Sequence, residues 1–400
     1  MGKVDQVKTK PEGPEGSEGP AGPESSAGPA DVAEPAGVSA VPGRPRTALI
    51  LGAGGLMGLA YHAGVLRALE KATDFRAADA DLMIGTSAGA VIAAYLRAGW
   101  GVEDLWNLAM DASRLDGTTP PLPKSPLSGG RRARRLPLGA KAVLEMQSGA
   151  ENIPAPPVGG MAEWDRHVMA PAFRTPLDLA RRGVGAAYVL SRSIWRLPGP
   201  ALPPLPAALT ALFPGGLFTM PEGRRRLSAD LPEAWPSGSG QELWLVAYDI
   251  HRRQRVVLGR HGTPRISLVD AVLASSAIPG VYAPVPLDGM SLVDGGVSST
   301  THMNLAAANG CQRIICLAPM AYDEAAPPSA LDQMIRKWST RALQRETESA
   351  VGRGVTPEIY VPSRAEIRLQ GRNFMSPGGL QKVAEAAFES TLTRLEEQAA

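Results

Sequence analysis

The sequence predicts an α/β fold with a mostly parallel central sheet flanked by helices in three layers. Two consecutive strand–turn–helix units support this prediction. In the first, over residues 46–72, an apolar strand at 48–51 leads into a glycine turn and a helix with apolar residues at helical spacing. In the second, a strand at 81–84 leads through a tight turn at 85–89 into a helix that stops at Gly99. Tandem units of this kind favour parallel strands covered by helices.

Composition narrows the possible classes of function. The chain has 400 residues, 44% of them hydrophobic, and a formal net charge of +2, so it carries no global signature of nucleic-acid binding. Its N-terminus lacks the apolar core of a signal peptide, and no window offers about 18 uninterrupted apolar residues. We therefore expect a cytoplasmic protein without a nucleic-acid partner, and peripheral membrane contact stays open. No feature indicates an oligomeric state.

The chain divides into three regions by composition. Residues 1–44 consist mainly of Pro, Gly, Glu, Ala and Ser, and such a segment buries too little apolar surface to fold. We predict a disordered tail there and a catalytic domain over 45–400. Within this domain, residues 118–240 are proline-rich and irregular, and so long a stretch is typical of an insertion or lid.

The remaining periodic segments predict further elements. Candidate helices lie at residues 101–112, 138–147, 176–196, 266–276 and 379–397. Candidate strands lie at 242–247, with a hairpin partner at 254–259, and in "MSLVDGG" and "QRIICLAP".

Cys311 and Cys316 are the two cysteines, and they stand at the two ends of "CQRIIC", a stretch that the sequence predicts to be strand. Alternation would direct them to opposite faces of the sheet, so we expect buried free thiols and no disulfide between them.

Ser87 lies between Gly85 and Gly89 in the turn that joins the second strand to its helix. A nucleophile elbow needs this context, because small residues let the chain turn sharply and the helix N-terminus favours negative charge. The competing interpretation is an ordinary glycine turn capped by Ser or Thr.

The first turn, residues 52–58, reads Gly-Ala-Gly-Gly-Leu-Met-Gly. Its backbone N–H groups could hold a phosphate or a developing oxyanion. The third glycine is wrongly spaced for a dinucleotide-binding loop, and no acidic residue ends a strand about 20 positions later. A Walker phosphate loop is excluded, because no Gly-Lys-Ser/Thr follows.

A serine nucleophile requires a base, and two residues are candidates. His302 is the one serious histidine among five, because the others lie in the first helix, in the insertion or beside the hairpin. Asp294 ends a strand at a Gly-Gly turn, from which a side chain reaches the carboxyl edge of a parallel sheet.

Taken together, these segments resemble the patatin-like phospholipases. That family carries a glycine-rich oxyanion loop, a Gly-x-Ser-x-Gly elbow some 30 residues later, and a distant Asp-Gly-Gly or Asp-Gly-Ala. Here the matching segments are residues 52–58, 85–89 and 294–296. A fourth, "ASSAIPGVYAPV" at 274–285, is similar to the family's Ala-Ser-x-Ala-x-Pro block.

The resemblance implies a Ser-Asp dyad, with Ser87 as nucleophile and Asp294 as its base. It implies an oxyanion hole formed by the N–H groups of Gly54, Gly55 and Leu56. The expected reaction is hydrolysis of a lipid ester through an acyl-serine intermediate, with neither cofactor nor metal. Because an exposed aspartate is a weak base, the dyad needs direct contact and an apolar surround.

The sequence departs from the family pattern at three places. Ala53 replaces the first of three glycines in the loop, and Met57 replaces an arginine or lysine. Residues 297–302 stand where many relatives carry Asn and Pro. The loss of the cation bears on head-group preference more than on ester hydrolysis.

Two alternative functions stay open. One is an α/β-hydrolase-type esterase that uses Ser87, His302 and an aspartate such as Asp270; only about 40 ordered residues precede Ser87, whereas that fold places several strands before its elbow. The other is a catalytically silent lipid-binding protein on the same fold. In either lipid-related function the insertion would cover the site, and its arginines at 131–135 would contact anionic lipid or sit in a solvated loop.

Overall fold

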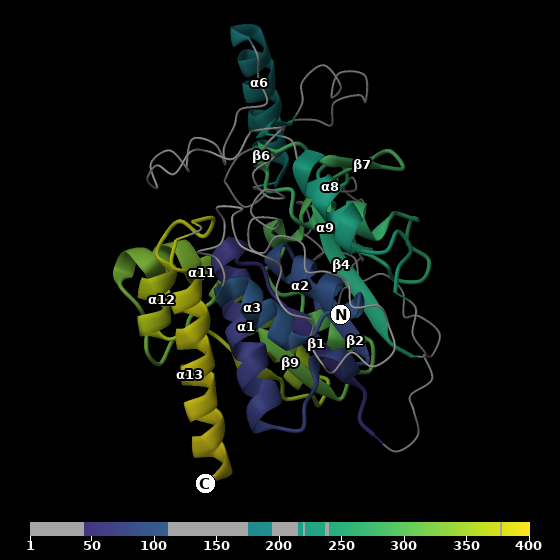
Figure 1. Ribbon diagram of the computed structural model, residues 1–400. Helices are drawn as coiled ribbons and strands as arrows, with labels where there is room; N and C mark the ends of the chain where they lie inside the picture. Colours follow the sequence, from purple (N-terminus) through teal and green to yellow (C-terminus); the bar gives the residue numbers. More distant parts are fainter. Residues whose placement is uncertain (1–43, 111–174, 194–214, 219–220, 237–239, 377) are drawn as a thin grey trace, which may run out of the picture. The chain divides into compact units, whose positions relative to one another are not determined.

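The computed structural model describes residues 44–110, 175–193, 215–218, 221–236, 240–376 and 378–400 (Figure 1). The predicted tail therefore lies outside the described residues, apart from Arg44, as do the helix expected at 138–147 and the arginines at 131–135. The boundaries of the tail, the insertion and the catalytic domain stay predictions.

The described part of the chain is built on a sheet of eight strands in the order β10-β9-β1-β2-β4-β8-β7, with β5 paired to β4. Neighbouring strands from β10 to β4 run parallel, whereas β5, β7 and β8 add antiparallel pairs. The predicted mostly parallel sheet is thus confirmed. The strands are β1 (Thr47–Leu51), β2 (Leu82–Gly85), β4 (Glu242–Asp249), β5 (Gln254–Leu258), β7 (Val285–Leu287), β8 (Met290–Asp294), β9 (Arg313–Leu317) and β10 (Glu358–Tyr360).

Alternate residues of β1 supply two hydrophobic cores, one on each face of the sheet. Leu49 and Leu51 enter one core and Ala48 and Ile50 the other, as the two-residue period of a strand requires. Because all five β1 residues are buried, helices must cover both faces.

Helices from both halves of the chain form these covering layers. The first face is covered by α1 (Gly55–Ala72), α2 (Ala88–Arg97), α3 (Val102–Met110), α9 (Leu268–Ser275) and α13 (Leu380–Ala399). The second is covered by α10 (Asn304–Ala308) and α11 (Ala330–Val351). The predicted three-layer arrangement is confirmed.

Helix α13 packs along α1, as Figure 1 shows. A Cβ on Gly64 of α1 would lie 2.3 Å from the carbonyl oxygen of Ala384, so only glycine permits this approach. The predicted closing helix is therefore confirmed and has a defined partner.

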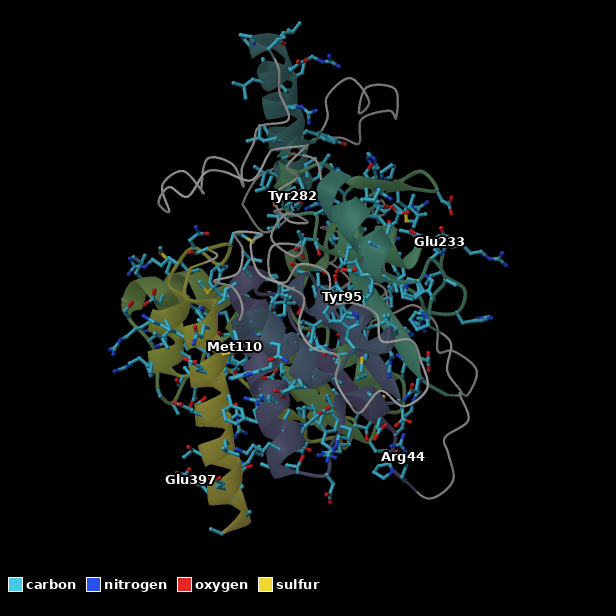
Figure 2. All side chains as sticks on the ribbon, in the orientation of Figure 1. Arg44, Tyr95, Met110, Glu233, Tyr282 and Glu397 are labelled. Carbon is cyan, nitrogen blue, oxygen red and sulfur yellow. The ribbon has the colours of Figure 1, made fainter. Side chains whose placement is uncertain are left out.

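Described parts of the predicted insertion attach to the sheet region at several points. Strand β3 (Gly216–Phe218) pairs with β6 (Gly280–Tyr282), whose Tyr282 is labelled in Figure 2 and is 1% exposed. Helix α6 (Pro176–Ser193) hydrogen-bonds through Arg192 to the carbonyl oxygen of Ile250 at 2.8 Å. Asp230, at the end of α8 (Pro221–Asp230), accepts a hydrogen bond from the Tyr95 hydroxyl at 2.9 Å.

The structure corrects the argument about the cysteines while confirming its outcome. Both thiols are buried and free, and burial raises their pKa values, that of Cys311 to about 11. They do not lie on opposite faces, because Cys311 precedes β9 and both side chains join the same hydrophobic core.

None of the described helices is both long enough and apolar enough to cross a membrane.

Candidate functional site

Two strands bring the predicted site residues together from opposite directions. Strand β2 runs parallel to β4, with Gly85 opposite Leu245, and β8 runs antiparallel to β4, with Asp294 opposite Ala247. Because β5 occupies the other edge of β4 over the same residues, β2 and β8 must share one edge. Their carboxyl ends therefore meet there, on either side of Val246.

Ser87 sits at the tip of the turn between β2 and α2, in a conformation that few non-glycine residues adopt. Its φ of 54° and ψ of −119° are a local strain that folded proteins retain mainly at functional sites. The flanking glycines make the turn possible: a Cβ on Gly85 would lie 2.6 Å from the Cα of Ala90, and one on Gly89 would lie 1.9 Å from the carbonyl oxygen of Leu51. This is the geometry expected of a nucleophile elbow.

Asp294 ends β8 and contacts Ser87 directly. The N–H of Gly296 donates a hydrogen bond to its carboxylate at 2.7 Å, and the Ser87 hydroxyl lies near enough to lower the pKa of that carboxylate as a donor. Asp294 is 6% exposed and Ser87 is 5% exposed. Burial outweighs these hydrogen bonds and raises the pKa of Asp294 to about 6, so the carboxylate is a stronger base than an exposed aspartate.

Ser275, from the Ala-Ser-x-Ala-x-Pro segment, supports both sides of this pair. Its hydroxyl accepts a hydrogen bond from the Ser87 N–H at 3.0 Å and donates one to the carbonyl oxygen of Val246 at 2.6 Å. Two residues further on, the carbonyl oxygen of Ala277 accepts from the N–H of Asp294 at 2.9 Å. One short segment thus fixes the backbone of both site residues.

The glycine loop between β1 and α1 presents free N–H groups. The N–H groups of Gly52, Ala53, Met57 and Gly58 bond to backbone carbonyls. In contrast, no hydrogen bond within the described residues involves the N–H of Gly54, Gly55 or Leu56. A helix start with three such donors favours a developing negative charge.

Two segments from the second half of the chain pack against this loop. A Cβ on Gly54 would lie 2.9 Å from Pro319, and one on Gly55, whose φ is +59°, would lie 2.7 Å from the carbonyl oxygen of Phe374. That same carbonyl accepts the N–H of Met57 at 3.1 Å. Substitution of either glycine would displace the loop.

The buried Arg336 of α11 contacts both of these segments. It is 1% exposed and donates hydrogen bonds to the carbonyl oxygen of Pro319 at 2.6 Å and to Gln370 at 2.5 Å. Its guanidinium also lies 5.0 Å from the ring centre of Phe374. Burial lowers its pKa to about 10, so it stays charged at neutral pH.

Met57, the residue in place of the family's cation, does not face the site opening. It is 2% exposed and packs in the hydrophobic core. The position therefore contributes packing in this chain, and Arg336 supports the loop indirectly through Pro319 and Phe374.

His302 lies behind the Asp294 turn and does not contact Ser87. Its Nε2–H donates to the carbonyl oxygen of Gly295 at 3.2 Å, and its Nδ1 accepts from Arg255 at 3.4 Å. Burial lowers its pKa well below the ordinary value, so the ring is neutral. With both nitrogens engaged, it has no free atom with which to act as a base.

Glu346 of α11 holds the segment that follows Asp294. Its carboxylate accepts hydrogen bonds from the Thr301 hydroxyl and the Met303 N–H, both at 2.7 Å. The Thr300 carbonyl oxygen then accepts from the N–H of Ala53 at 2.8 Å. The atypical residues after Asp294 thus connect the two loops of the site.

Asp270, the aspartate of the alternative triad, and His62, which was not expected to be a base, both lie elsewhere. Asp270 lies in the first turn of α9, where its carboxylate accepts a hydrogen bond from the capping Ser267 at 2.7 Å and pairs with Arg224. His62 is buried and bonds to the carbonyl oxygen of Gly52 at 2.8 Å, and burial lowers its pKa to about 4. Among the described residues, no group of three or more His, Cys, Asp or Glu side chains could hold a metal ion.

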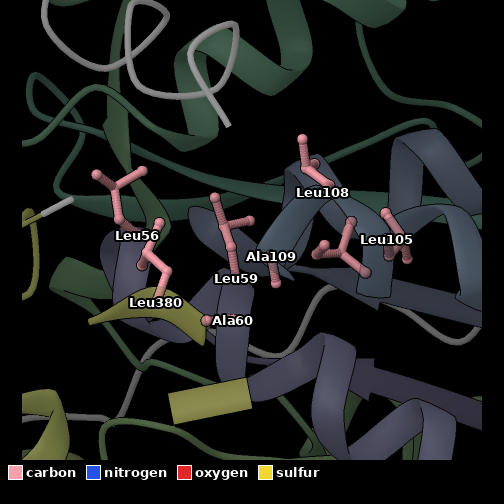
Figure 3. A pocket seen from close by; sticks show the side chains of 8 residues that line it. Leu56, Leu59, Ala60, Leu105, Leu108, Ala109 and Leu380 are labelled. Atoms are coloured by element: carbon pink, nitrogen blue, oxygen red, sulfur yellow. The ribbon is translucent and has the colours of Figure 1, made fainter. Parts of the chain in front are cut away.

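An apolar hollow opens between α1, α2, α3 and α13 next to the glycine loop (Figure 3). Its volume is about 330 Å³ when the adjoining space open to solvent is included. Leu56 connects it to the site, because its backbone N–H belongs to the loop and its side chain lines the hollow. The lining residues are Leu56, Leu59, Ala60, Ile92, Leu105, Leu108, Ala109 and Leu380.

The sequence profile described as patatin-like phospholipase matches residues 49–307, which span the glycine loop, the elbow and Asp294. The chain belongs to the patatin-like phospholipase family. The resemblance stated from the motifs is thus confirmed over most of the chain. No curated protein matches this patatin-like sequence.

Two solved structures share limited similarity with this patatin-like chain. VipD from Legionella pneumophila is 14% identical with a TM-score of 0.39, and the match covers 88% of this chain and 67% of VipD. The type III effector ExoU of Pseudomonas aeruginosa is 18% identical with a TM-score of 0.33, and the match covers 89% of this chain. This chain therefore spans about half of ExoU, 54%.

Some residues that support the site were not predicted from the sequence. Ser275 lies in the Ala-Ser-x-Ala-x-Pro segment, but that motif predicts no role for its hydroxyl. Arg336, Glu346 and Phe374 lie in or near helices that no motif marked. A capping signal at Ser329 and Asp332, where the Ser329 hydroxyl accepts the Asp332 N–H at 3.3 Å, could have revealed the start of α11.

Proposed function

We propose that this patatin-like protein hydrolyses carboxyl esters of phospholipids or related lipids through an acyl-serine intermediate. The observation that carries the proposal is the buried Asp294 carboxylate beside Ser87 at the meeting strand ends, because burial raises the pKa of this carboxylate to about 6. A carboxylate with that pKa is ionised at neutral pH and accepts a proton more readily than an exposed aspartate.

Acylation follows from these contacts. Asp294 removes the proton from the Ser87 Oγ as that oxygen attacks the ester carbonyl carbon. The carbonyl oxygen becomes an oxyanion and accepts hydrogen bonds from the N–H groups of Gly54, Gly55 and Leu56. The tetrahedral intermediate then collapses, the bond to the alcohol oxygen breaks, and Asp294 returns its proton to the departing alcohol.

Deacylation repeats the sequence with water as the nucleophile. Asp294 removes a proton from the water as it attacks the acyl-serine carbonyl carbon. The bond to Ser87 Oγ then breaks, and the proton returns to that oxygen as the fatty acid leaves. This cycle needs no metal or cofactor. The hollow at Leu56 provides apolar surface for the acyl chain, because a bound chain there would keep its carbonyl beside the loop.

Substitution of the dyad tests the proposal. Ser87→Ala and Asp294→Asn should abolish fluorophosphonate labelling and ester turnover while the circular dichroism spectrum stays unchanged. Ser276→Ala is the matched control, since Ser276 is also buried and its hydroxyl has no hydrogen-bond partner in the described residues. Full turnover in either dyad variant would refute the assignment.

The catalytically silent alternative predicts a different result. In that case the wild-type protein would bind liposomes but would neither label with fluorophosphonate nor release fatty acid from any lipid in a mixed extract. Comparison of lipid products between the wild-type protein and Ser87→Ala separates the two functions and identifies the substrate class.

A further inference from the structure

Helix α11 presents an apolar stripe to solvent at its N-terminal end. Leu331, Met334 and Ile335 occupy positions i, i+3 and i+4, so they share one face of the helix. Their exposed fractions are 42%, 68% and 37%. Large apolar side chains gathered on one exposed face indicate an interaction surface.

The same region carries more exposed basic than acidic side chains, although the exposed Glu324 carboxylate also lies against α11 and accepts a hydrogen bond from Gln344. The acidic side chains of residues 330–345 and 364–372 are Asp332, which pairs with Arg372 at 3.3 Å, and Glu366, which is 2% exposed. Exposed basic residues outnumber them: Lys337, Arg341, Arg345, Arg364, Arg368 and Arg372. The apolar stripe is therefore bordered by positive charge.

Helix α12 (Arg364–Gln370) joins α11 in this surface. Gln370 accepts a hydrogen bond from Arg336 at 2.5 Å, and its neighbour Leu369 is 41% exposed. Figure 1 shows α11 and α12 beside each other. We call the exposed apolar and basic residues of 331–345 and 364–372 the α11–α12 surface.

The α11–α12 surface is connected to the site. Arg336 lies one residue from Ile335 and contacts Pro319 and the Phe374 ring, which pack against the glycine loop. Arg336 therefore links the helix that carries this surface to the two segments that pack against the glycine loop.

We propose that the α11–α12 surface docks the enzyme on anionic lipid bilayers. Apolar side chains that enter the acyl boundary and basic side chains that meet anionic head groups are the two elements of interfacial binding. Pairing with a second copy of the chain is disfavoured, because it would bring two cationic faces together. This inference rests on the proposed lipid hydrolase function, since docking presents the substrate to Ser87.

Vesicle binding of the full chain tests the surface separately from catalysis. Leu331→Ser combined with Met334→Ser should lower binding to phosphatidylcholine–phosphatidylserine vesicles at least about tenfold, because two exposed apolar anchors are lost. Val351→Ser is the matched control: it is on the same helix, 53% exposed, and about 25 Å from Met334 along the axis. It should bind as the wild type does.

Charge is tested in the same assay. Lys337→Gln and Arg341→Gln should each weaken binding to the anionic vesicles about fivefold. They should leave the weaker binding to pure phosphatidylcholine unchanged. Equal loss on both vesicle types would overturn the electrostatic part of the proposal.

Hydrolysis separates failure of docking from failure of the proposed function. The stripe variant should lose turnover of vesicle lipids while it retains turnover of a short-chain soluble ester. Ser87→Ala should bind vesicles normally but turn over neither substrate. Full soluble-ester turnover by Ser87→Ala would refute the hydrolase mechanism alone. Wild-type vesicle binding by the stripe variant, or a dimer in light scattering that the variant converts to a monomer, would overturn the docking proposal.

Discussion

The hydroxyl of Ser275 accepts a hydrogen bond from the backbone N–H of Ser87 at 3.0 Å, although the two residues are 188 positions apart. Ser275 is 0% exposed, and its own hydrogen is donated to the carbonyl oxygen of Val246. Since Val246 lies between the partners of Gly85 and Asp294 on β4, this hydroxyl ties the strained elbow to the strand that aligns both site residues.

Ser275→Ala should therefore lower both activity and stability. The substitution leaves two buried backbone groups unsatisfied, which costs about 1–3 kcal/mol each, and releases the strained Ser87 backbone. We expect kcat/KM to fall about tenfold and the melting temperature to drop. Ser276→Ala removes a neighbouring hydroxyl without a described partner, and it should change neither quantity measurably. Equal effects of the two substitutions would contradict the role of Ser275.

The pH dependence of kcat/KM should report the Asp294 carboxylate. Because burial raises its pKa to about 6, the ionised base is lost as pH falls through 6, and kcat/KM should decline about tenfold per pH unit below that value. Initial rates on a soluble ester from pH 4.5 to 8 would measure this. If kcat/KM instead declined at a pH near the ordinary pKa of aspartate, the buried carboxylate would not be the titrating base.

Asp294 should also reduce the stability of the folded protein at neutral pH. Its pKa rises from 3.8 to about 6 on folding, so the folded state binds the proton more tightly. The stability gained from that proton is complete below about pH 4 and is lost as pH rises through 6. Because the pKa rises by about two, this loss of stability amounts to about 3 kcal/mol. Asp294→Asn should thus raise the melting temperature at pH 8 while abolishing turnover, and should raise it less at pH 4.

How much of this site is predictable from sequence depends on where each contact originates. Ser87, Asp294 and the glycine loop were predicted because each lies at a strand end with turn residues that local rules recognise. The roles of Arg336 and Glu346 follow only from tertiary packing, since both lie on a largely polar helix whose sequence shows no link to the loops it supports. For the same reason α11, α12 and β10 were not predicted.

His302 should be dispensable for chemistry. The neutral ring bonds to Gly295 and Arg255, and the backbone φ of 58° is one that asparagine tolerates. His302→Asn should therefore retain turnover within about tenfold of the wild type, the loss reflecting a looser Asp294 turn. A Ser-His-Asp triad would instead make this variant as inactive as Ser87→Ala. Steady-state kinetics of both variants on one ester decides between them.

Arg336 should position the oxyanion loop through Pro319 and Phe374. Arg336→Met removes the buried hydrogen bonds to Pro319 and Gln370 while it preserves apolar volume, so the loop N–H groups lose their alignment. Since loss of one oxyanion donor costs about 100- to 1,000-fold, we expect kcat to fall about 10- to 100-fold with little change in KM, and Arg336→Lys to give an intermediate kcat. Arg97→Met is the matched control, because Arg97 also donates to backbone carbonyls, of Ala78, Ala80 and Glu242, and its pKa is also lowered to about 10. Arg97 ends α2 at the opposite end from Ser87, so its substitution should lower the melting temperature and leave kcat unchanged. If both variants lost stability and kcat in the same proportion, Arg336 would be a structural residue with no specific effect on the loop.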